Sequence, residues 1–228
     1  MEAIVLAGGL GTRLRGVVDD VPKPMAPVQG RPFLALVLDQ LVGGGFKTAI
    51  VAAGYRHEVI RSYFGADYRG LALRYSVEHE PLGTGGAIRL ACAQADARDV
   101  FVLNGDTYLE LDFRAMMEAH ARAESLLSMA ISHVSDVARY GALELCDDRV
   151  QRFLEKGRSG PGWINGGTYV LGPDLRARLR PQGAFSFEHE LLATEVRTIR
   201  PLAFRSSGLF IDIGIPEDYA RAQQIFAG

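Results

Sequence analysis

Short apolar runs alternate with segments of helical spacing through the first half of the chain. Runs of this length, bounded by glycine or polar residues, predict buried strands over residues 3–7, 48–53, 71–77 and 100–103. The segments between them predict helices over residues 33–42, 57–64 and 85–95. Strands that alternate with helices indicate βαβ crossovers, and therefore a largely parallel sheet covered on both faces.

The second half has a different pattern, with more strands and shorter connections. Strands are predicted over residues 126–133, 141–146, 150–153, 168–171 and 202–205, and clear helices only over 187–193 and 216–226. No linker of proline and serine divides the halves. We therefore expect one α/β domain over residues 1–228, a Rossmann-like three-layer sandwich with a mostly parallel, mixed central sheet. Its halves cover about residues 1–125 and 126–228.

Glycine and polar residues follow three of the predicted strands. Gly8, Gly54 and the segment 104–106 (Asn-Gly-Asp) come where these strands end. Ligands of such sheets bind beyond the carboxyl ends of the strands. We expect these residues to share one edge of the sheet and to face a ligand.

Composition excludes several other classes of protein. A formal net charge of −2 disfavours broad nucleic-acid binding, and we expect neither a signal peptide nor a membrane-spanning segment. Cys92 and Cys146 lack zinc spacing and are interpreted as buried thiols, which fits a reducing cytoplasm. The histidines are interpreted as structural or surface residues.

The most informative segment is the glycine-rich turn after the first strand. Gly8-Gly9 alone indicates only a tight turn, and the segment lacks the endings of a P-loop and of a dinucleotide fingerprint. Arg13 follows, however, and Lys23 stands between Pro22 and Pro24. Because prolines stiffen the backbone around Lys23, the pattern favours a phosphate site with two cations directed at it.

The pattern Gly-Gly-x-Gly-Thr-Arg-Leu, followed by Pro-Lys-Pro, resembles the sugar-1-phosphate nucleotidyltransferase family. Within it, the chain is most similar to the guanylyltransferases that act on D-glycero-α-D-manno-heptose 1-phosphate, from Glu2 to about Tyr219. The resemblance implies the GT-A-like fold and attack of a sugar 1-phosphate on the α-phosphorus of an NTP. It implies Arg13 and Lys23 as catalytic residues. It also implies a nucleotide loop that includes Leu6, Gly8, Gly9, Gly11 and Thr12.

Two aspartates are candidate metal ligands. Asp106 ends the Asn-Gly-Asp segment, which alone is typical of a turn. Asp212 is flanked by apolar residues, so it is either a rare buried charge or a ligand. The resemblance implies that both hold Mg²⁺ against the phosphates.

A second glycine-rich element precedes the predicted helix 85–95. By itself it is typical of a helix N-terminus, whereas the resemblance implies contacts of Gly83, Thr84 and Gly85, together with Asn104, with the nucleotide. Guanine presents two adjacent donors that suit a carboxylate, which makes Glu80 the candidate guanine reader and favours GTP over UTP. Exposure of Glu80 to solvent is the alternative.

The acceptor site is predicted from short elements of the second half. By resemblance, Lys156 binds the sugar phosphate, and Glu155, Asn165 and the backbone of Gly141 bind hydroxyls. An exposed ion pair of Glu155 with Lys156 and a turn at Asn165 are the alternatives. Ser186 is interpreted as a helix N-cap.

Several alternatives stay open on the sequence. The same motifs would serve mannose 1-phosphate with GTP, or N-acetylmuramate 1-phosphate with UTP. A nucleotide-sugar-binding regulator without activity is a further class, although binding alone needs no cation for a leaving group. A dehydrogenase domain is disfavoured because Leu14 stands where its third glycine belongs. Small-molecule substrates are the only partners expected, and a homodimer is an open alternative to a monomer.

Overall fold

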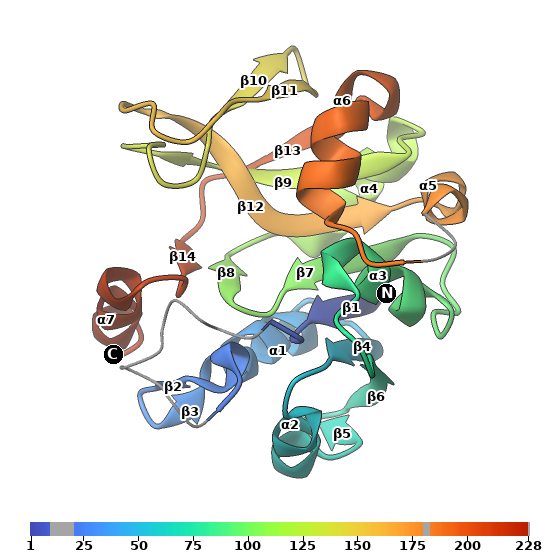
Figure 1. The fold of residues 1–228 in the computed structure, drawn as a ribbon, viewed down its shortest axis with the longest axis vertical. Coiled ribbons are helices and arrows are strands. Elements are labelled where there is room, and N and C mark those ends of the chain that lie inside the picture. Colours follow the sequence, from blue (N-terminus) through green and yellow to red (C-terminus); the bar gives the residue numbers. More distant parts are fainter. Residues whose placement is uncertain (10–20, 180–182, 228) are drawn as a thin grey trace.

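One mixed ten-stranded sheet runs through both halves of the chain (Figure 1). The computed structural model describes residues 1–9, 21–179 and 183–227. The strand order in the sheet is β10-β11-β13-β9-β12-β7-β1-β4-β6-β5. In chain order these strands are β1 (Glu2–Leu6), β4 (Thr48–Ala53), β5 (Asp67–Tyr68), β6 (Leu71–Val77), β7 (Val100–Asn104), β9 (Leu127–Val134), β10 (Leu143–Cys146), β11 (Arg149–Phe153), β12 (Gly162–Leu171) and β13 (Leu202–Ser206).

The first half supplies the parallel part of the sheet. β1 pairs in parallel with β4 and β7, and β4 pairs in parallel with β6. β12 lies antiparallel to both β7 and β9, and so joins the two halves. The prediction of a mostly parallel, mixed sheet is confirmed.

Helices cover both faces of this sheet. They are α1 (Phe33–Gly43), α2 (His57–Phe64), α3 (Gly83–Cys92), α4 (Phe113–Arg122), α5 (Pro173–Arg178), α6 (Ala193–Ile199) and α7 (Pro216–Ile225), with a 3₁₀ turn η2 (Lys23–Met25) and a π-helix η3 (Phe187–Leu192). Side chains alternate along β1, so that Ala3 and Val5 face one apolar cluster and Ile4 faces the other. The structure is therefore three-layered, as predicted.

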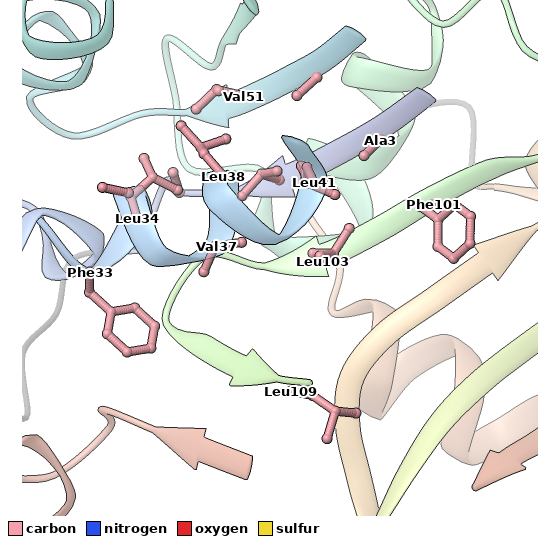
Figure 2. Packing of buried hydrophobic residues seen from close by; sticks show 14 of the residues in the cluster. Ala3, Phe33, Leu34, Val37, Leu38, Leu41, Val51, Phe101, Leu103 and Leu109 are labelled. Carbon is pink, nitrogen blue, oxygen red and sulfur yellow. The ribbon is translucent and has the colours of Figure 1, made fainter. Parts of the chain in front are cut away.

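The first cluster packs α1 onto the parallel strands. Leu34, Leu38 and Leu41 of α1 are fully buried, and Val51 of β4 lies in the same cluster (Figure 2). The second cluster lies under α3, α5, η3 and α6. Because both faces of the central strands are buried, the loops at their ends are the parts left to form a site.

Four short elements complete the described chain. β2 (Pro27–Val28) pairs with β3 (Arg31–Pro32), and β8 (Thr107–Leu109) pairs with β14 (Phe210–Asp212). The second of these pairs is important for the site, because it joins the segment after β7 to a segment near the end of the chain.

The structure departs from the sequence prediction in both halves. α4 of the first half and α5 and α6 of the second are additional helices, and β12 begins at Gly162 rather than at residue 168. β10 begins at Leu143, because Gly141 has a φ of +82°, outside the extended region. The prediction of a buried Cys146 is wrong: this thiol is exposed, since β10 is an edge strand.

Candidate active site

Asp106 and Asp212 meet because β8 and β14 pair. Asp106 lies in the turn between β7 and β8, and Asp212 is opposite Thr107 in the antiparallel register. The backbone N–H of Ile213 also donates to the carbonyl of Asp106 at 3.1 Å. Two carboxylates far apart in the sequence are thus held side by side.

Lys23 lies between these two carboxylates. Its Nζ is 2.5 Å from Asp106 Oδ2 and 3.8 Å from Asp212 Oδ1. Pro22 and Pro24 flank it in a 3₁₀ turn, in which the N–H of Met25 donates to the carbonyl of Pro22 at 2.7 Å. The lysine side chain is only 14% exposed. The proline-flanked backbone therefore presents Lys23 to the aspartates, whereas the sequence argument predicts that it is directed at a phosphate.

Asp212 is held in an unfavourable environment for a charge. Burial raises its pKa above the ordinary value, and the neighbouring charge of Asp106 adds to this effect. Lys23 and the N–H of Gly214, which donates to Asp212 Oδ1 at 2.7 Å, act in the opposite direction. The pair of carboxylates would therefore gain from further positive charge.

The donors at this point fit a hard divalent cation. Asp106 and Asp212 offer oxygen ligands, which such cations take, and both are partly accessible. Among the residues that the structure describes, no group of three or more histidine, cysteine, aspartate or glutamate side chains could hold a metal. A cation here would therefore complete its coordination with water or with oxygens of a ligand.

A cavity of about 400 Å³ extends from the carboxylates to one side, along the end of β1 and the start of α3. The predicted nucleotide residues Leu6, Gly8, Gly9, Gly83, Thr84 and Asn104 line it. Gly85 does not line it. This glycine is buried, and a Cβ there would lie 2.1 Å from the ring of Phe185, so its absence of a side chain serves packing.

At the end of this cavity near Gly8 and Gly83, the lining carboxylate is that of Glu78 and not that of Glu80. Glu80 is exposed and is not among the lining residues. Glu78 lies over Gly8 and Gly54, whose Cβ atoms, if present, would come within 2.8 and 2.5 Å of its Oε1. The N–H of Leu82 donates to Glu78 Oε2 at 3.1 Å. The missing side chains of Gly8 and Gly54 thus make room for Glu78.

A second cavity, of about 630 Å³, extends to the other side of the carboxylates. The predicted acceptor residues Gly141, Glu155, Lys156 and Asn165 all line it. Lys23, Asn104, Asp106 and Glu188 line both cavities. The structure therefore brings the two predicted half-sites together at Lys23 and Asp106.

A buried tyrosine that the sequence did not single out joins two residues of the acceptor-cavity lining. Asn165 Nδ2 donates to the hydroxyl of Tyr169 at 2.6 Å, and that hydroxyl donates to Glu188 Oε1 at 2.8 Å. Burial raises the pKa of Tyr169 well above its ordinary value, and the charge of Glu188 adds to this. A protonated Tyr169 therefore fixes the positions of Asn165 and Glu188.

Glu188 and the neighbouring His189 come from the π-helix η3, and both line the acceptor cavity. The predicted cap is confirmed, because Ser186 Oγ accepts from the N–H of His189 at 3.1 Å. A π-helix is frequent at functional sites, but no sequence pattern distinguished it from an ordinary turn of helix. Arg139, adjacent to the predicted Gly141, also lines the cavity and pairs with Asp218 of α7.

Three predicted residues cannot be placed. Gly11, Thr12 and Arg13 lie outside the described residues.

A class of protein follows from this fold and site. Residues 2–227 match the family model for nucleotidyl transferases, and the chain belongs to that family. It is 43% identical to the D-glycero-alpha-D-manno-heptose 1-phosphate guanylyltransferase of Aneurinibacillus thermoaerophilus, over 98% of this chain and 97% of that protein. It is 40% identical to the protein of the same name from Campylobacter jejuni, over 96% and 97% of the two chains.

A solved structure is similar over the same length. The structure of HddC from Yersinia pseudotuberculosis, complexed with GMP-PN, superposes with a TM-score of 0.88 at 40% identity, over 99% of each chain. The predicted resemblance and the nucleotidyltransferase fold are thus confirmed. In the described residues, no helix is long and apolar enough to cross a membrane.

The raised pKa of Asp212 predicts a pH-dependent stability. When the pKa of a carboxyl is higher in the folded than in the unfolded state, the group does not change the free energy of unfolding at pH values below its unfolded-state pKa. As the pH rises through its folded-state pKa, the carboxyl ionises and the native state is destabilised. In chelator, Asp212→Asn should therefore be more stable than wild type at about pH 7, and the gain should shrink towards about pH 4. Each unit of pKa shift corresponds to about 1.4 kcal/mol.

Urea unfolding of both proteins across this pH range measures the effect. Addition of a divalent cation should reverse the order, because Asp212→Asn removes one of the two carboxylates that would bind it. Stability curves that stay parallel at all pH values would contradict the environment described for Asp212.

Proposed function

We propose that this protein transfers the guanylyl group of GTP to D-glycero-α-D-manno-heptose 1-phosphate, which yields GDP-heptose and pyrophosphate. The observation that carries the proposal is the position of Lys23 and the aspartate pair at the junction of two cavities. One cavity has the size and glycine-rich lining of a nucleotide site, and the other offers lysine, glutamate and asparagine side chains to a phosphosugar. The names of the relatives support the choice of base and sugar.

The nucleotide would lie in the cavity beside β1 and α3. Its guanine presents N1–H and N2–H, and of the carboxylates that line this cavity, Glu78 is the one outside the cluster of Lys23, Asp106 and Glu188 shared with the other cavity, so it is assigned to accept from both. We therefore assign guanine recognition to Glu78, with Glu80 outside the pocket. The Yersinia relative was solved with GMP-PN, which is consistent with a guanine nucleotide here.

The reaction needs charge neutralisation more than proton transfer. The attacking oxygen of a sugar phosphate is already anionic, so no general base is required. Lys23 would bind the α-phosphate and the incoming phosphate, since it lies where the cavities meet. By the family pattern, Arg13 would stabilise the leaving pyrophosphate together with the loop of Gly11 and Thr12.

Asp106 and Asp212 would hold Mg²⁺, which prefers oxygen ligands and keeps positions for water and phosphate. When bound, the ion supplies charge neutralisation to the phosphates. Lys23 would then exchange its contact with Asp106 for one with phosphate.

On the acceptor side, Lys156 would bind the sugar phosphate, and Glu155, Asn165 and the backbone of Gly141 the hydroxyls. Two free cysteines, one of them exposed, are compatible with work in a reducing cytoplasm.

A substrate panel tests the proposal. Pyrophosphate release should be measured for the four NTPs with heptose, mannose, glucose and N-acetylhexosamine 1-phosphates. We expect the highest kcat/KM for GTP with the heptose 1-phosphate. A preference for UTP, or for mannose 1-phosphate, would replace the proposed substrates while leaving nucleotidyl transfer in place.

Lys23→Ala should lower kcat by about 10²–10³-fold, because one cation at the reacting phosphates is removed. The assay should contain saturating Mg²⁺, which restores positive charge beside the aspartates, and circular dichroism should verify the fold. Lys47→Ala, at an exposed lysine outside both cavities, is the matched control and should keep wild-type turnover. Wild-type turnover of Lys23→Ala would remove Lys23 from the mechanism.

Glu78→Gln should lower kcat/KM for GTP roughly tenfold or more, about 1.4 kcal/mol. The carboxylate has two oxygens that accept from the two guanine donors, whereas the amide has only one. The values for UTP should change much less. Glu80→Gln is the matched control, two residues away with the same chemical change, and should leave nucleotide preference unaltered. If only Glu80→Gln shifts the preference, the assignment to Glu78 is wrong.

A further inference from the structure

A third cavity, of about 330 Å³, lies between β11 and the C-terminal end of α6. Both elements are near the end of the sheet formed by β10 and β11 (Figure 1). None of its lining residues lines either cavity of the candidate active site. The lining consists of Cys146, Arg149, Val150, Gln151, Arg152, Arg197 and Arg200. Of the described residues around it, four are arginines and none is acidic.

The arginines of this cavity have few counter-charges. Arg149 donates to neutral acceptors, which are Ser125 Oγ at 2.9 Å and the carbonyls of Arg200 and Ala123 at 3.0 and 3.5 Å. Arg152 has one ion pair, 3.5 Å from Nε to Glu144 Oε2, in which both side chains are about half exposed. Arg197 and Arg200 are exposed, and neither forms an ion pair within the described part of the chain.

Several arginines elsewhere in the described residues are neutralised by carboxylates. Arg31 and Arg69 both bind Asp39 at 2.7 Å, and Arg74 binds Asp96 at 2.9 Å. The whole chain carries a formal net charge of −2. The negative end of α6 offsets only about half a charge. The four arginines are therefore a local excess of positive charge rather than part of a basic protein.

We propose that this cavity binds a small molecule that carries a diphosphate group, at a site separate from the substrate cavities. Guanidinium groups bind phosphate oxygens in pairs of parallel hydrogen bonds, and they keep their charge at all physiological pH values. A diphosphate presents two adjacent phosphoryl groups, which match arginines that come from two neighbouring elements, β11 and the C-terminal end of α6. The volume is within the range of small-molecule sites.

The two walls of this cavity continue into the acceptor cavity. β11 ends at Phe153, which is followed by Leu154, Glu155 and Lys156, and α6 begins at Ala193; all of these residues line the acceptor cavity. A diphosphate that bridges Arg149 or Arg152 to Arg197 or Arg200 therefore restrains both segments. The proposal concerns binding and does not depend on the substrates proposed above.

Hydrogen exchange of the full chain, measured by mass spectrometry in chelator, tests this site directly. The probes are inorganic pyrophosphate, GDP and orthophosphate at equal ionic strength. We expect pyrophosphate and GDP to protect residues 146–152 and 195–200, and orthophosphate to do so at least tenfold more weakly. Binding of the same probes in the two active-site cavities would protect residues 6–9, 21–26 and 153–156, so protection of residues 146–152 and 195–200 without these segments distinguishes the new site.

Arg197→Gln with Arg200→Gln should weaken this protection at least tenfold, because both side chains of the α6 wall lose their charge. Both residues are exposed, so the fold should be kept. The matched control is Arg114→Gln with Arg122→Gln on α4, which changes the net charge equally at exposed positions and should keep the protection. Protection by GDP alone would assign the site to nucleoside diphosphates, and protection by both probes to the diphosphate group itself.

The proposal is overturned if neither pyrophosphate nor GDP protects the two segments at millimolar concentration. It is also overturned if the α4 control loses protection as much as the α6 variant, since nonspecific charge attraction would then explain the binding. Nucleotidyl transfer is measured separately, so a failure of the substrates proposed above leaves this test unaffected.

Discussion

The contact of one ammonium group with two carboxylates organises this molecule. Lys23, Asp106 and Asp212 come from a 3₁₀ turn, from the end of a parallel strand and from a short strand near the end of the chain. Two carboxylates this close would repel each other and bind protons more strongly without a cation between them. The two cavities of the candidate active site lie on the two sides of this cluster, so the cluster determines where they meet.

The rest of the fold keeps these three segments in register. β1 and β7 are adjacent parallel strands, so their loops emerge together, and the β8–β14 pair delivers Asp212 to the same place. α7, which follows Asp212, then holds the segment after Lys23. The hydroxyl of Tyr219 and the amide of Gln223 both donate to the carbonyl of Pro27. The positions of Lys23 and Asp212 are therefore linked through backbone as well as through charge.

Local patterns were sufficient for the parallel half of the sheet, because its strands are continuous apolar runs and its helices have clear spacing. They were sufficient also for Lys23, since flanking prolines restrict the backbone whatever surrounds it. They were insufficient for Glu78. Its side chain occupies the space left by Gly8 and Gly54, which lie at the ends of two other strands. The pattern of residues 187–193 likewise gave no sign of the π-helix that presents Glu188. Such positions depend on contacts between distant segments.

Glu188 lines both cavities of the candidate active site and accepts a hydrogen bond from the hydroxyl of buried Tyr169. A ligand that moves or orders this side chain from one cavity changes the wall of the other. The free energies of binding in the two cavities are then coupled, and thermodynamic linkage makes the coupling reciprocal. Whatever factor the nucleotide imposes on the affinity for the sugar phosphate, the sugar phosphate imposes on the affinity for the nucleotide. With the substrates in the two cavities as proposed, a carboxylate shared by both linings would make their binding cooperative within one subunit.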